Sequence, residues 1–288
     1  MSDENDTIPA EALADVAYLS RSANRVEILQ TLSRGSHTRR ELTELTGASR
    51  TTLDRIVNEL EERGWARRTD DGDYTATPAG DHLMAQLLPF VESVEAIRRL
   101  DETVAWLPSE DLSIGLHHFS DASVLRPDHG DPMETADYLA TLIRDTAEFR
   151  ALTQFTPPLP LAEAMRERIV AEQLTAEYVL TDELIEYLRE QPERRERWRD
   201  LLQGDADMFR VRGSIPCNLW IFDDIVVIKK SGPESFNESY GVPIQSENET
   251  VLSWAHNLLD RCRADAARVN AAAFPDDVAV PRADSDDE

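Results

Sequence analysis

The chain has 288 residues, of which 41% are hydrophobic, so it is long enough for two domains with apolar cores. No run of about 18 apolar residues occurs, and residues 1–9 lack the basic start and apolar stretch of a signal peptide. The sequence therefore predicts a soluble cytoplasmic protein and argues against a membrane protein. Two cysteines, Cys217 and Cys262, make neither a disulfide framework nor a zinc motif. We expect two buried or half-buried thiols, with a redox pair as the alternative.

The net charge of −26 is unevenly distributed along the chain. Lys229 and Lys230 are the only lysines, so 30 − 2 = 28 of the basic residues are arginine. Residues 20–80 hold ten arginines and ten acids, and the rest holds 20 basic and 46 acidic residues, which gives 20 − 46 = −26. An acidic, lysine-poor surface is typical of proteins from salt-loving archaea, in which carboxylates hold water and cations. Because residues 20–80 escape this bias, an anionic partner would be tolerated there.

Helical periodicity dominates the first part of the chain. The apolar spacing predicts helices over residues 12–20 and 24–32. Thr38, followed three residues later by Glu41, forms a capping box that starts the next helix. Ser49 caps a further helix, whose apolar residues are spaced by three and four.

A β-hairpin is predicted directly after these helices. Two short strand-like runs at residues 65–69 and 73–77 are joined by an Asp-Asp-Gly turn. Thr77 and Pro78 then start another helix, with Thr77 as its cap. Helices joined by a turn and followed by a hairpin predict a winged helix-turn-helix domain over residues 12–80.

A heptad pattern begins at residue 83. Apolar residues alternate in steps of four and three, with Asp101 in the one polar position, which is typical of a coiled-coil seam of three heptads. We expect Pro89 to kink or split this helix. The pattern predicts a linker and dimerisation helix over residues 81–108; an amphipathic helix packed on its own domain is the alternative. The predicted dimerisation residues are Leu83, Leu87, Phe90, Val94, Ile97 and Val104.

Strands and helices alternate in the remainder, which predicts an α+β or α/β fold: a mixed α/β sandwich domain over residues 109–267. Flexible residues 1–11 precede the winged helix, and an acidic, disordered tail over residues 268–288 ends the chain. The predicted strands are 122–125, 149–155, 176–180, 208–211, 217–222, 225–230 and 240–244, and the predicted helices are 159–172, 181–189, 192–202 and 250–267.

The helix that begins after Ser49 is the expected DNA-reading element, because the second helix of a helix-turn-helix lies in the major groove. Arg50 at its start can contact guanine O6 and N7 as a fork. The preceding helix begins at Thr38, where free N–H groups favour a phosphate. The wing turn carries carboxylates that repel phosphate, so we expect the turn not to insert. The predicted DNA-binding residues are Thr38, Arg39, Arg40, Ser49, Arg50, Thr51, Thr52, Arg55, Asn58, Arg67, Arg68 and Tyr74.

Catalysis has little support in the sequence. His117 and His118 are adjacent, and on a strand they would point to opposite faces and could not serve one site. No Gly-rich phosphate loop, His-x-Lys pair or Cys/His metal spacing occurs. We therefore expect no enzyme, no cofactor and no metal. A protein-binding winged helix and, less favoured, an enzyme of unknown activity remain the alternatives.

Several segments resemble a known family. The segments starting at Ser22 (SANRVEIL), His37 (HTRREL), Thr46 (TGASRTTL) and Leu60 (LEERGW), together with Ile215 (IPCNLWIFDD), resemble haloarchaeal winged helix-turn-helix regulators. Their C-terminal domain is shared with a methanogen regulator of filament formation and methanogenesis genes.

The resemblance covers about residues 12–265 and implies a one-component regulator. Its implied partners are double-stranded DNA, a second copy of the chain and a small effector of unknown identity and unknown binding residues. The chain departs from the family pattern at Cys217, Asn218 and Trp220, where small or aliphatic residues are more usual.

Overall fold

The computed structural model describes residues 9–126, 132–157, 159–204, 206–232 and 242–275. The chain divides into two compact units, Met1–Val91 and Glu92–Glu288. Helix α5 (Pro78–Leu100) begins in the first unit and ends in the second. None of the helices in the described ranges is long and apolar enough to cross a membrane.

The first unit has the predicted order of helices followed by a hairpin. Apolar residues from its helices and from both strands form one core, which includes Ile28, Leu42 and Ile56. The hairpin strands are antiparallel, with Ala66 opposite Ala76. The predicted winged helix-turn-helix is therefore confirmed as a fold. Its elements are α1 (Ala10–Ser20), α2 (Ala23–Arg34), α3 (Arg39–Thr46), α4 (Arg50–Glu62), β1 (Ala66–Arg68) and β2 (Tyr74–Ala76).

Local capping fixes the turn between α3 and α4. The Thr38 side chain accepts a hydrogen bond from the Glu41 backbone N–H, and the Glu41 carboxylate accepts one from the Thr38 N–H at 2.8 Å. Gly47 ends α3 in the left-handed region with φ 65°, which a residue with a Cβ rarely adopts. The Ser49 hydroxyl then accepts from the Thr52 N–H and caps α4. The predicted capping box and the predicted Ser49 cap are both confirmed.

A polar cluster attaches α1 to the rest of the first unit. The Tyr18 hydroxyl donates to the Glu59 carboxylate at 2.9 Å, and the Arg25 guanidinium lies 4.0 Å from the Tyr18 ring centroid. Burial and the neighbouring Glu59 raise the pKa of Tyr18 to about 12, so its hydroxyl stays protonated and able to donate. The cluster holds α1 and α2 against α4.

Helix α5 differs from the single linker helix expected for residues 81–108. It continues through Pro89 and ends at Leu100. Asp101 takes a left-handed backbone with φ 52°, and a 3-10 helix, η1 (Asp101–Trp106), follows. The expected split at Pro89 does not occur. The expected extension of the helix to residue 108 is wrong, because the left-handed residue Asp101 changes the chain direction before the third heptad is complete.

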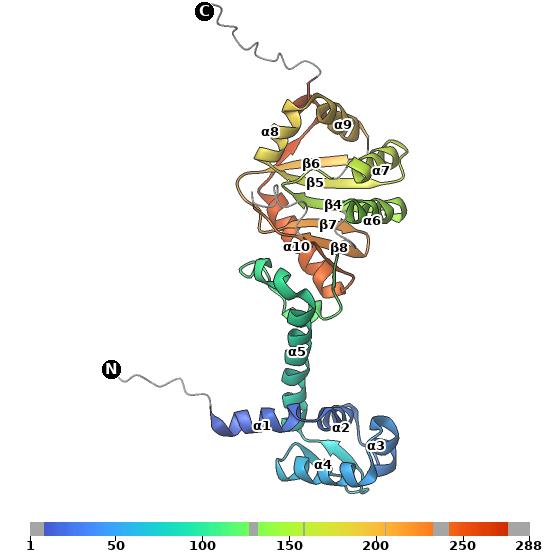
Figure 1. The fold of residues 1–288 in the computed structure, drawn as a ribbon, viewed down its shortest axis with the longest axis vertical. Helices are drawn as coiled ribbons and strands as arrows, with labels where there is room; N and C mark the ends of the chain where they lie inside the picture. Colours follow the sequence, from blue (N-terminus) through green and yellow to red (C-terminus); the bar gives the residue numbers. More distant parts are fainter. Residues whose placement is uncertain (1–8, 127–131, 158, 205, 233–241, 276–288) are drawn as a thin grey trace, which may run out of the picture. The chain divides into compact units, whose positions relative to one another are not determined.

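The second unit is built on one mixed eight-stranded sheet with the order β10-β6-β5-β4-β7-β8-β9-β3 (Figure 1). Strands β4, β5 and β6 are mutually parallel, and every other pairing is antiparallel. The strands are β3 (Ser123–Val124), β4 (Glu148–Thr153), β5 (Thr175–Thr181), β6 (Ala206–Val211), β7 (Asn218–Phe222), β8 (Ile225–Lys229), β9 (Ile244–Ser246) and β10 (Ala267–Val269).

Helices cover both faces of this sheet. On one face, α6, α7, α8 and α9 bury a core that includes Tyr178 and Trp220. On the other face, α10 buries a second core that includes Val179 and Leu219. The predicted mixed α/β sandwich is thus confirmed as a sheet between two helical layers. Its helices are α6 (Pro132–Asp145), α7 (Leu159–Val170), α8 (Asp182–Glu190), α9 (Pro192–Gln203) and α10 (Glu249–Ala264).

Four details of this domain depart from expectation. Helix α6 was not predicted at all. The last helix ends at Ala264 rather than continuing to residue 267, and β10 follows it and pairs with β6. The disordered tail expected from residue 268 is therefore wrong for residues 268–275, which include β10 and the buried Phe274. The strand predicted for residues 240–244 begins at Ile244; residues 240 and 241 lie outside the described part of the chain.

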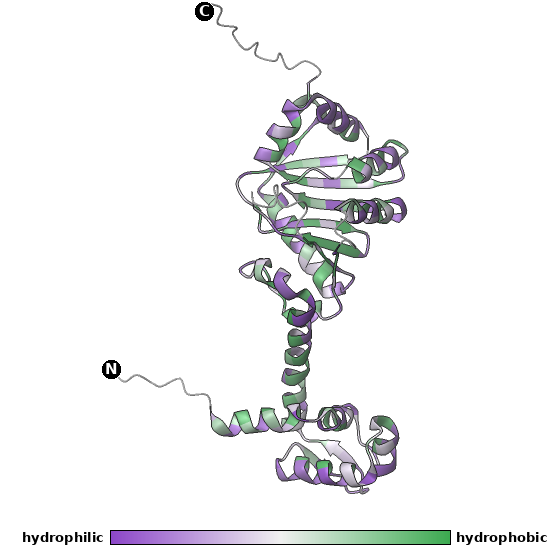
Figure 2. Cartoon of the chain, in the orientation of Figure 1, coloured by the Kyte–Doolittle hydropathy of each residue, from purple (hydrophilic) through white to green (hydrophobic). Residues whose placement is uncertain are grey.

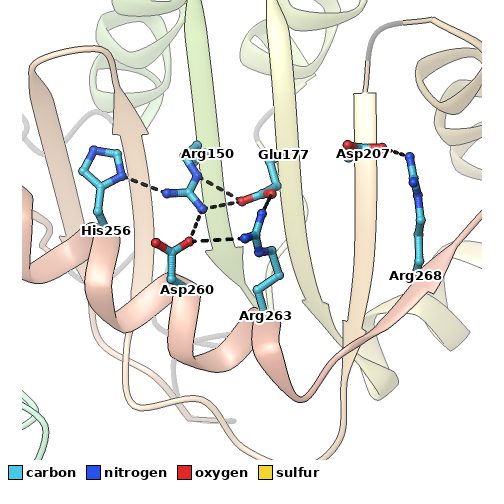
Figure 3. Close-up of polar contacts among 7 residues, drawn as sticks. All are labelled: Arg150, Glu177, Asp207, His256, Asp260, Arg263 and Arg268. Carbon is cyan, nitrogen blue, oxygen red and sulfur yellow. Dashed lines mark hydrogen bonds and ion pairs between the residues drawn. The ribbon is translucent and has the colours of Figure 1, made fainter.

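An ionic network joins α10 to the parallel strands (Figure 3). The Arg150 guanidinium on β4 donates to Glu177 on β5 and to Asp260 on α10, each at 2.6 Å. Arg263 pairs with Glu177 from the other side at 2.6 Å, and His256 Nδ1 lies 3.0 Å from Arg150. A separate pair, Arg268 with Asp207, joins β10 to β6.

Candidate nucleic-acid interface

The outward face of α4 carries the side chains expected to read DNA. Arg50, Thr51, Arg55 and Asn58 are exposed, whereas the opposite face is buried in the core of the first unit through Leu53, Ile56, Val57 and Leu60. The apolar spacing thus fixes which face of α4 is presented.

The predicted DNA-binding residues of α4 differ in whether their side chains already have partners within the protein. The Arg50 guanidinium forms no ion pair or hydrogen bond with any described residue and is exposed, whereas Arg55 pairs with Glu59 at 3.0 Å. The hydroxyls of Ser49 and Thr52 lie 2.9 Å apart, and the Ser49 hydroxyl caps the helix. Arg50 is therefore the charged group at the helix start that is available to a ligand.

Arg39, at the start of α3, is held from two sides. Its Nε donates to the Tyr74 hydroxyl at 3.1 Å and lies 3.2 Å from Asp54 Oδ1 on α4. The side chain of Arg39 remains 53% exposed, so it can still meet a phosphate. This contact joins α3, α4 and the wing at one point.

Tyr74 is placed differently from the prediction. Its side chain belongs to the core and the residue is 2% exposed. It lies on β2 with its ring facing inward, and its hydroxyl orients Arg39. A direct contact of Tyr74 with DNA is therefore corrected to an indirect role, because the ring is buried under the wing.

At the start of α3, the Arg40 side chain is more available to a ligand than the Thr38 hydroxyl. The Arg40 side chain is 83% exposed and its Nε lies 3.9 Å from Glu44, a loose pair on one helix face. The Thr38 hydroxyl is already used, because it accepts from the Glu41 N–H and donates to the Glu41 carboxylate at 2.9 Å. Thr38 therefore acts first as a cap.

The wing carries two exposed arginines, of which only one forms a hydrogen bond within the protein. Arg67 and Arg68 on β1 are both exposed. Arg68 Nε donates to the Gly72 carbonyl at 3.0 Å and closes the hairpin turn, whereas Arg67 has no hydrogen bond or ion pair with a described residue. Gly72 itself has φ 90°, a conformation that suits glycine.

Sequence reasoning missed the acidic side chains around these arginines. The pairs Arg55 with Glu59 and Arg40 with Glu44 have the four-residue spacing of one helix face and could have been found. The pair of Arg39 with Asp54 could not, since it depends on how α3 packs on α4.

The predicted dimerisation residues lie in three different environments. Leu83 and Leu87 pack into the core of the first unit, and Val104 is partly buried against the core of the second. Val104 is thus corrected: it lies beyond the end of α5 and cannot extend the seam. Figure 2 shows much of α5 in the hydrophobic colour. Its exposed apolar residues are Phe90 at 60%, Val91 at 50%, Val94 at 41% and Ile97 at 45% exposure.

The histidine pair is also placed differently from expectation. His117 and His118 lie on a 3-10 helix, η2 (Leu116–Phe119), and their ring centroids are 3.9 Å apart. They do not point to opposite faces of a strand, because that segment turns rather than extends. Among the described residues, no group of three or more His, Cys, Asp or Glu side chains is arranged to hold a metal ion. Neither thiol forms a disulfide; Cys217 is buried and Cys262 half-buried.

Comparison with solved structures gives weak likenesses. TrmBL2, an archaeal chromatin protein with a novel mode of DNA binding, is 13% identical, and the match covers 91% of this chain and 100% of that chain with a TM-score of 0.40. NucT from Helicobacter pylori is 11% identical over 51% of this chain and 97% of its own, with a TM-score of 0.36. IdeR from T. acidophilum is 19% identical over 34% of this chain and 47% of its own, with a TM-score of 0.23. Scores this low carry no functional argument, and no curated protein matches the chain.

Two family models match the chain. The HVO_A0261 N-terminal domain matches residues 13–99, and the middle domain of the methanogenesis regulatory protein FilR1 matches residues 132–265. The first range covers the winged helix and nearly all of α5, and the second runs from α6 to the end of α10. The chain therefore carries an HVO_A0261 N-terminal domain followed by a FilR1 middle domain, which agrees with the resemblance that the sequence predicted.

Proposed function

We propose that this protein is a DNA-binding transcription regulator. The observation that carries the proposal is the recognition helix α4, which presents Arg50 without a partner among the described residues. It belongs to a charge-balanced segment of a chain whose net charge is −26. The match of the second unit to the FilR1 middle domain supports the same function, because FilR1 is named as a regulatory protein.

The geometry suggests how each group would act. The start of α4 enters the major groove, where the Arg50 guanidinium forms two hydrogen bonds to a guanine edge. Arg39 and Arg40 at the start of α3 meet phosphate oxygens and set the register, aided by the positive end of the helix dipole. Asn58 and Arg67 extend the contact along the groove and the backbone.

Two further parts complete the proposal. The exposed apolar residues of α5 join two copies, so that the dimer reads a pseudo-palindromic operator with half-sites about one helical turn apart. The second unit senses a small effector that changes the geometry of the dimer. An appended α/β domain is the motivation for the effector, and the exposed face of α5 is the motivation for the dimer.

A chromatin binding map followed by footprinting at native salt tests the DNA function. Arg50→Ala should weaken operator binding by about 1–3 kcal/mol and relax the base preference at one position. Arg212→Ala is the matched control, because it removes the same charge from an exposed arginine of the second unit. Unchanged occupancy after removal of Arg39, Arg40 and Arg50 together would show that the winged helix does not bind DNA.

A further inference from the structure

A hollow of about 360 Å³ lies at the carboxyl ends of the parallel strands β4 and β5. In α/β sheets, ligands bind outside the carboxyl ends of the parallel strands. The volume also lies in the range of small-molecule sites, about 300–1,000 Å³. The hollow is lined by Gln154, Thr156, Thr181, Glu183, Leu184 and Tyr187.

A much smaller hollow of about 10 Å³, room for about one water molecule, shares Thr156 with the first. Its walls come from α7, β5 and α9 and include Trp198, Arg194 and Arg197. The Arg194 guanidinium lies 5.3 Å from the ring centroid of Tyr187, which lines the larger hollow. Arg194 therefore stands at the boundary between the two hollows.

These two arginines differ from the other buried and half-buried arginines that the structure describes. Three of the others form ion pairs with carboxylates, and three donate to backbone carbonyls. Arg194 and Arg197 do neither with any described residue, although the chain has 56 acidic side chains. The ion-paired set is Arg25, Arg150 and Arg210, and the carbonyl-bound set is Arg168, Arg195 and Arg199.

A half-buried guanidinium has lost part of its hydration, so an anion that replaces the lost hydrogen bonds binds it well. Arginine suits a planar carboxylate, since its fork donates two parallel hydrogen bonds. The Tyr187 ring and Leu184 beside it offer an apolar surface to the rest of such a molecule. Glu183 is the one carboxylate in the lining and would repel the ligand's charge.

Hydrogen bonds fix the polar floor of the hollow, to which Gln154 contributes. The Gln154 backbone N–H donates to the Asn218 side-chain oxygen at 2.9 Å, and the Gln154 amide donates to the Gly232 carbonyl at 3.1 Å. Asn218 is 1% exposed and also accepts from the Thr153 hydroxyl at 3.0 Å. Lys229, opposite Asn218 in the sheet, is equally buried. A fixed polar floor lets a ligand bind without the cost of ordering the site.

We propose that this edge of the sheet binds a small organic carboxylate with an apolar body, held by Arg194 and Arg197. The carboxylate lies at the boundary of the two hollows, and the body lies against Leu184 and Tyr187. This inference rests on the proposed regulator function, in which the second unit senses a small effector. It adds the site and the chemical class of that effector.

Calorimetric titration of the full chain, without DNA and at constant KCl, tests the proposal. The probes are phenylacetate, 4-phenylbutanoate and hexanoate, each paired with its uncharged amide. At least one acid should bind saturably below roughly 10 mM, and its amide should bind at least about ten-fold more weakly. The paired variant Arg194→Gln with Arg197→Gln should lower the affinity for the acid by about ten-fold or more.

Two single variants sharpen the result. Arg189→Gln removes an exposed arginine of α8 that does not line either hollow, and it should leave the affinity unchanged. Glu183→Gln should tighten binding, because it removes a like charge from the lining. A thermal melt of each variant confirms that the fold is intact.

Three outcomes would overturn the proposal: no acid of the panel binds, the amides bind as tightly as the acids, or a folded arginine double variant keeps its affinity. None of these depends on DNA. Loss of operator binding by Arg50→Ala would still support the regulator function, so the two failures are distinguishable.

Discussion

Arg39 shows how single side chains are positioned at the candidate DNA interface. The Tyr74 hydroxyl and the Asp54 carboxylate hold its guanidinium from the wing and from α4. The sequence suggested Tyr74 as a residue that contacts DNA directly, and it gave no role to Asp54. The buried Tyr74 thus orients the exposed Arg39, and Asp54 on α4 partly neutralises the positive charge that Arg39 presents.

Replacing that acid should strengthen DNA binding. Asp54→Asn removes a negative charge from α4 and releases Arg39 for phosphate, and the lost surface ion pair contributes little to folding. We expect operator and scrambled DNA to bind more tightly by about 1 kcal/mol each, because the gain is electrostatic. Fluorescence anisotropy titration measures both affinities. Glu62→Gln, at the far end of α4, is the charge-matched control and should gain less; a weaker complex with Asp54→Asn would contradict the argument.

His256 gives the second unit a pH dependence. Partial burial and the neighbouring Arg150 lower the pKa of His256 below its ordinary value, although Asp260 opposes the shift. The neutral ring accepts from the Arg150 guanidinium through Nδ1, so protonation breaks this contact and places two cations together (Figure 3).

The sign of the effect follows from the lowered pKa. The stabilisation is fully present above the unfolded pKa of about 6.5 and is lost as the pH falls through the lower folded value. We expect the urea midpoint of the protein to fall between pH 7 and pH 5, and His256→Asn to flatten this slope. His82→Gln, on the exposed side of α5, should keep the slope of the parent protein. A parent slope in His256→Asn would contradict the assignment.

At the scale of elements, the apolar residues of α5 lie in three environments that the heptad pattern treated as one. Its first turns complete the core of the winged helix through Leu87, and its last turn enters the core of the second unit through Ala96 and Leu100. Only the exposed apolar residues between and beside these contacts are left for a partner. The heptad spacing therefore predicted the apolar positions but not the partner of each.

The dimer proposal is tested on that exposed face. Phe90→Glu with Val94→Glu places charges where two copies of α5 would meet, and burying them would be costly. Sedimentation at native salt should show a dimer for the parent and a monomer for the variant. Arg98→Glu, also at an exposed position of α5, changes the net charge by the same −2 and is the control for altered charge alone. A parent monomer, or a variant that remains dimeric, would exclude this face as the dimer contact.

The sequence predicts elements well where the signal is local. The Thr38 capping box, the Ser49 cap and the Asp-Asp-Gly hairpin turn depend on residues within a few positions of each other. Helix α6 was missed although Ala136, Leu139 and Ile143 have helical spacing, because residues 126–132 before it are rich in Pro, Asp and Gly. Contacts set by packing between distant segments, such as Arg39 with Asp54, cannot be read from spacing.

The same limit applies to the hollow beside α8. Gln154 and Tyr187 are far apart in sequence and line the same hollow because β4 and β5 are parallel and adjacent. Arg194 contacts Tyr187 from the next helix, α9. Alternating strands and helices predict an α/β sheet. They do not determine the order of the strands in the sheet, and so they do not show which strands have neighbouring carboxyl ends.

At the scale of the whole molecule, the charge distribution governs how the protein responds to salt. The excess of 46 acids over 20 basic residues lies outside residues 20–80, so like charges repel one another over the second unit and the termini. Salt shortens the range of this repulsion, from about 30 Å at 0.01 M to about 3 Å at 1 M. Screening therefore stabilises the compact state more than the expanded chain.

We expect the melting temperature to rise steadily with KCl between about 0.01 M and 1 M and to continue upward as carboxylates bind cations. Thermal melts followed by circular dichroism measure the rise. A sucrose series at matched water activity is the control, because sucrose stabilises by exclusion from the surface and does not screen charge. If KCl and sucrose raised the melting temperature equally, repulsion among the acids would not be the cause. Full stability at about 0.01 M salt would contradict the electrostatic argument altogether.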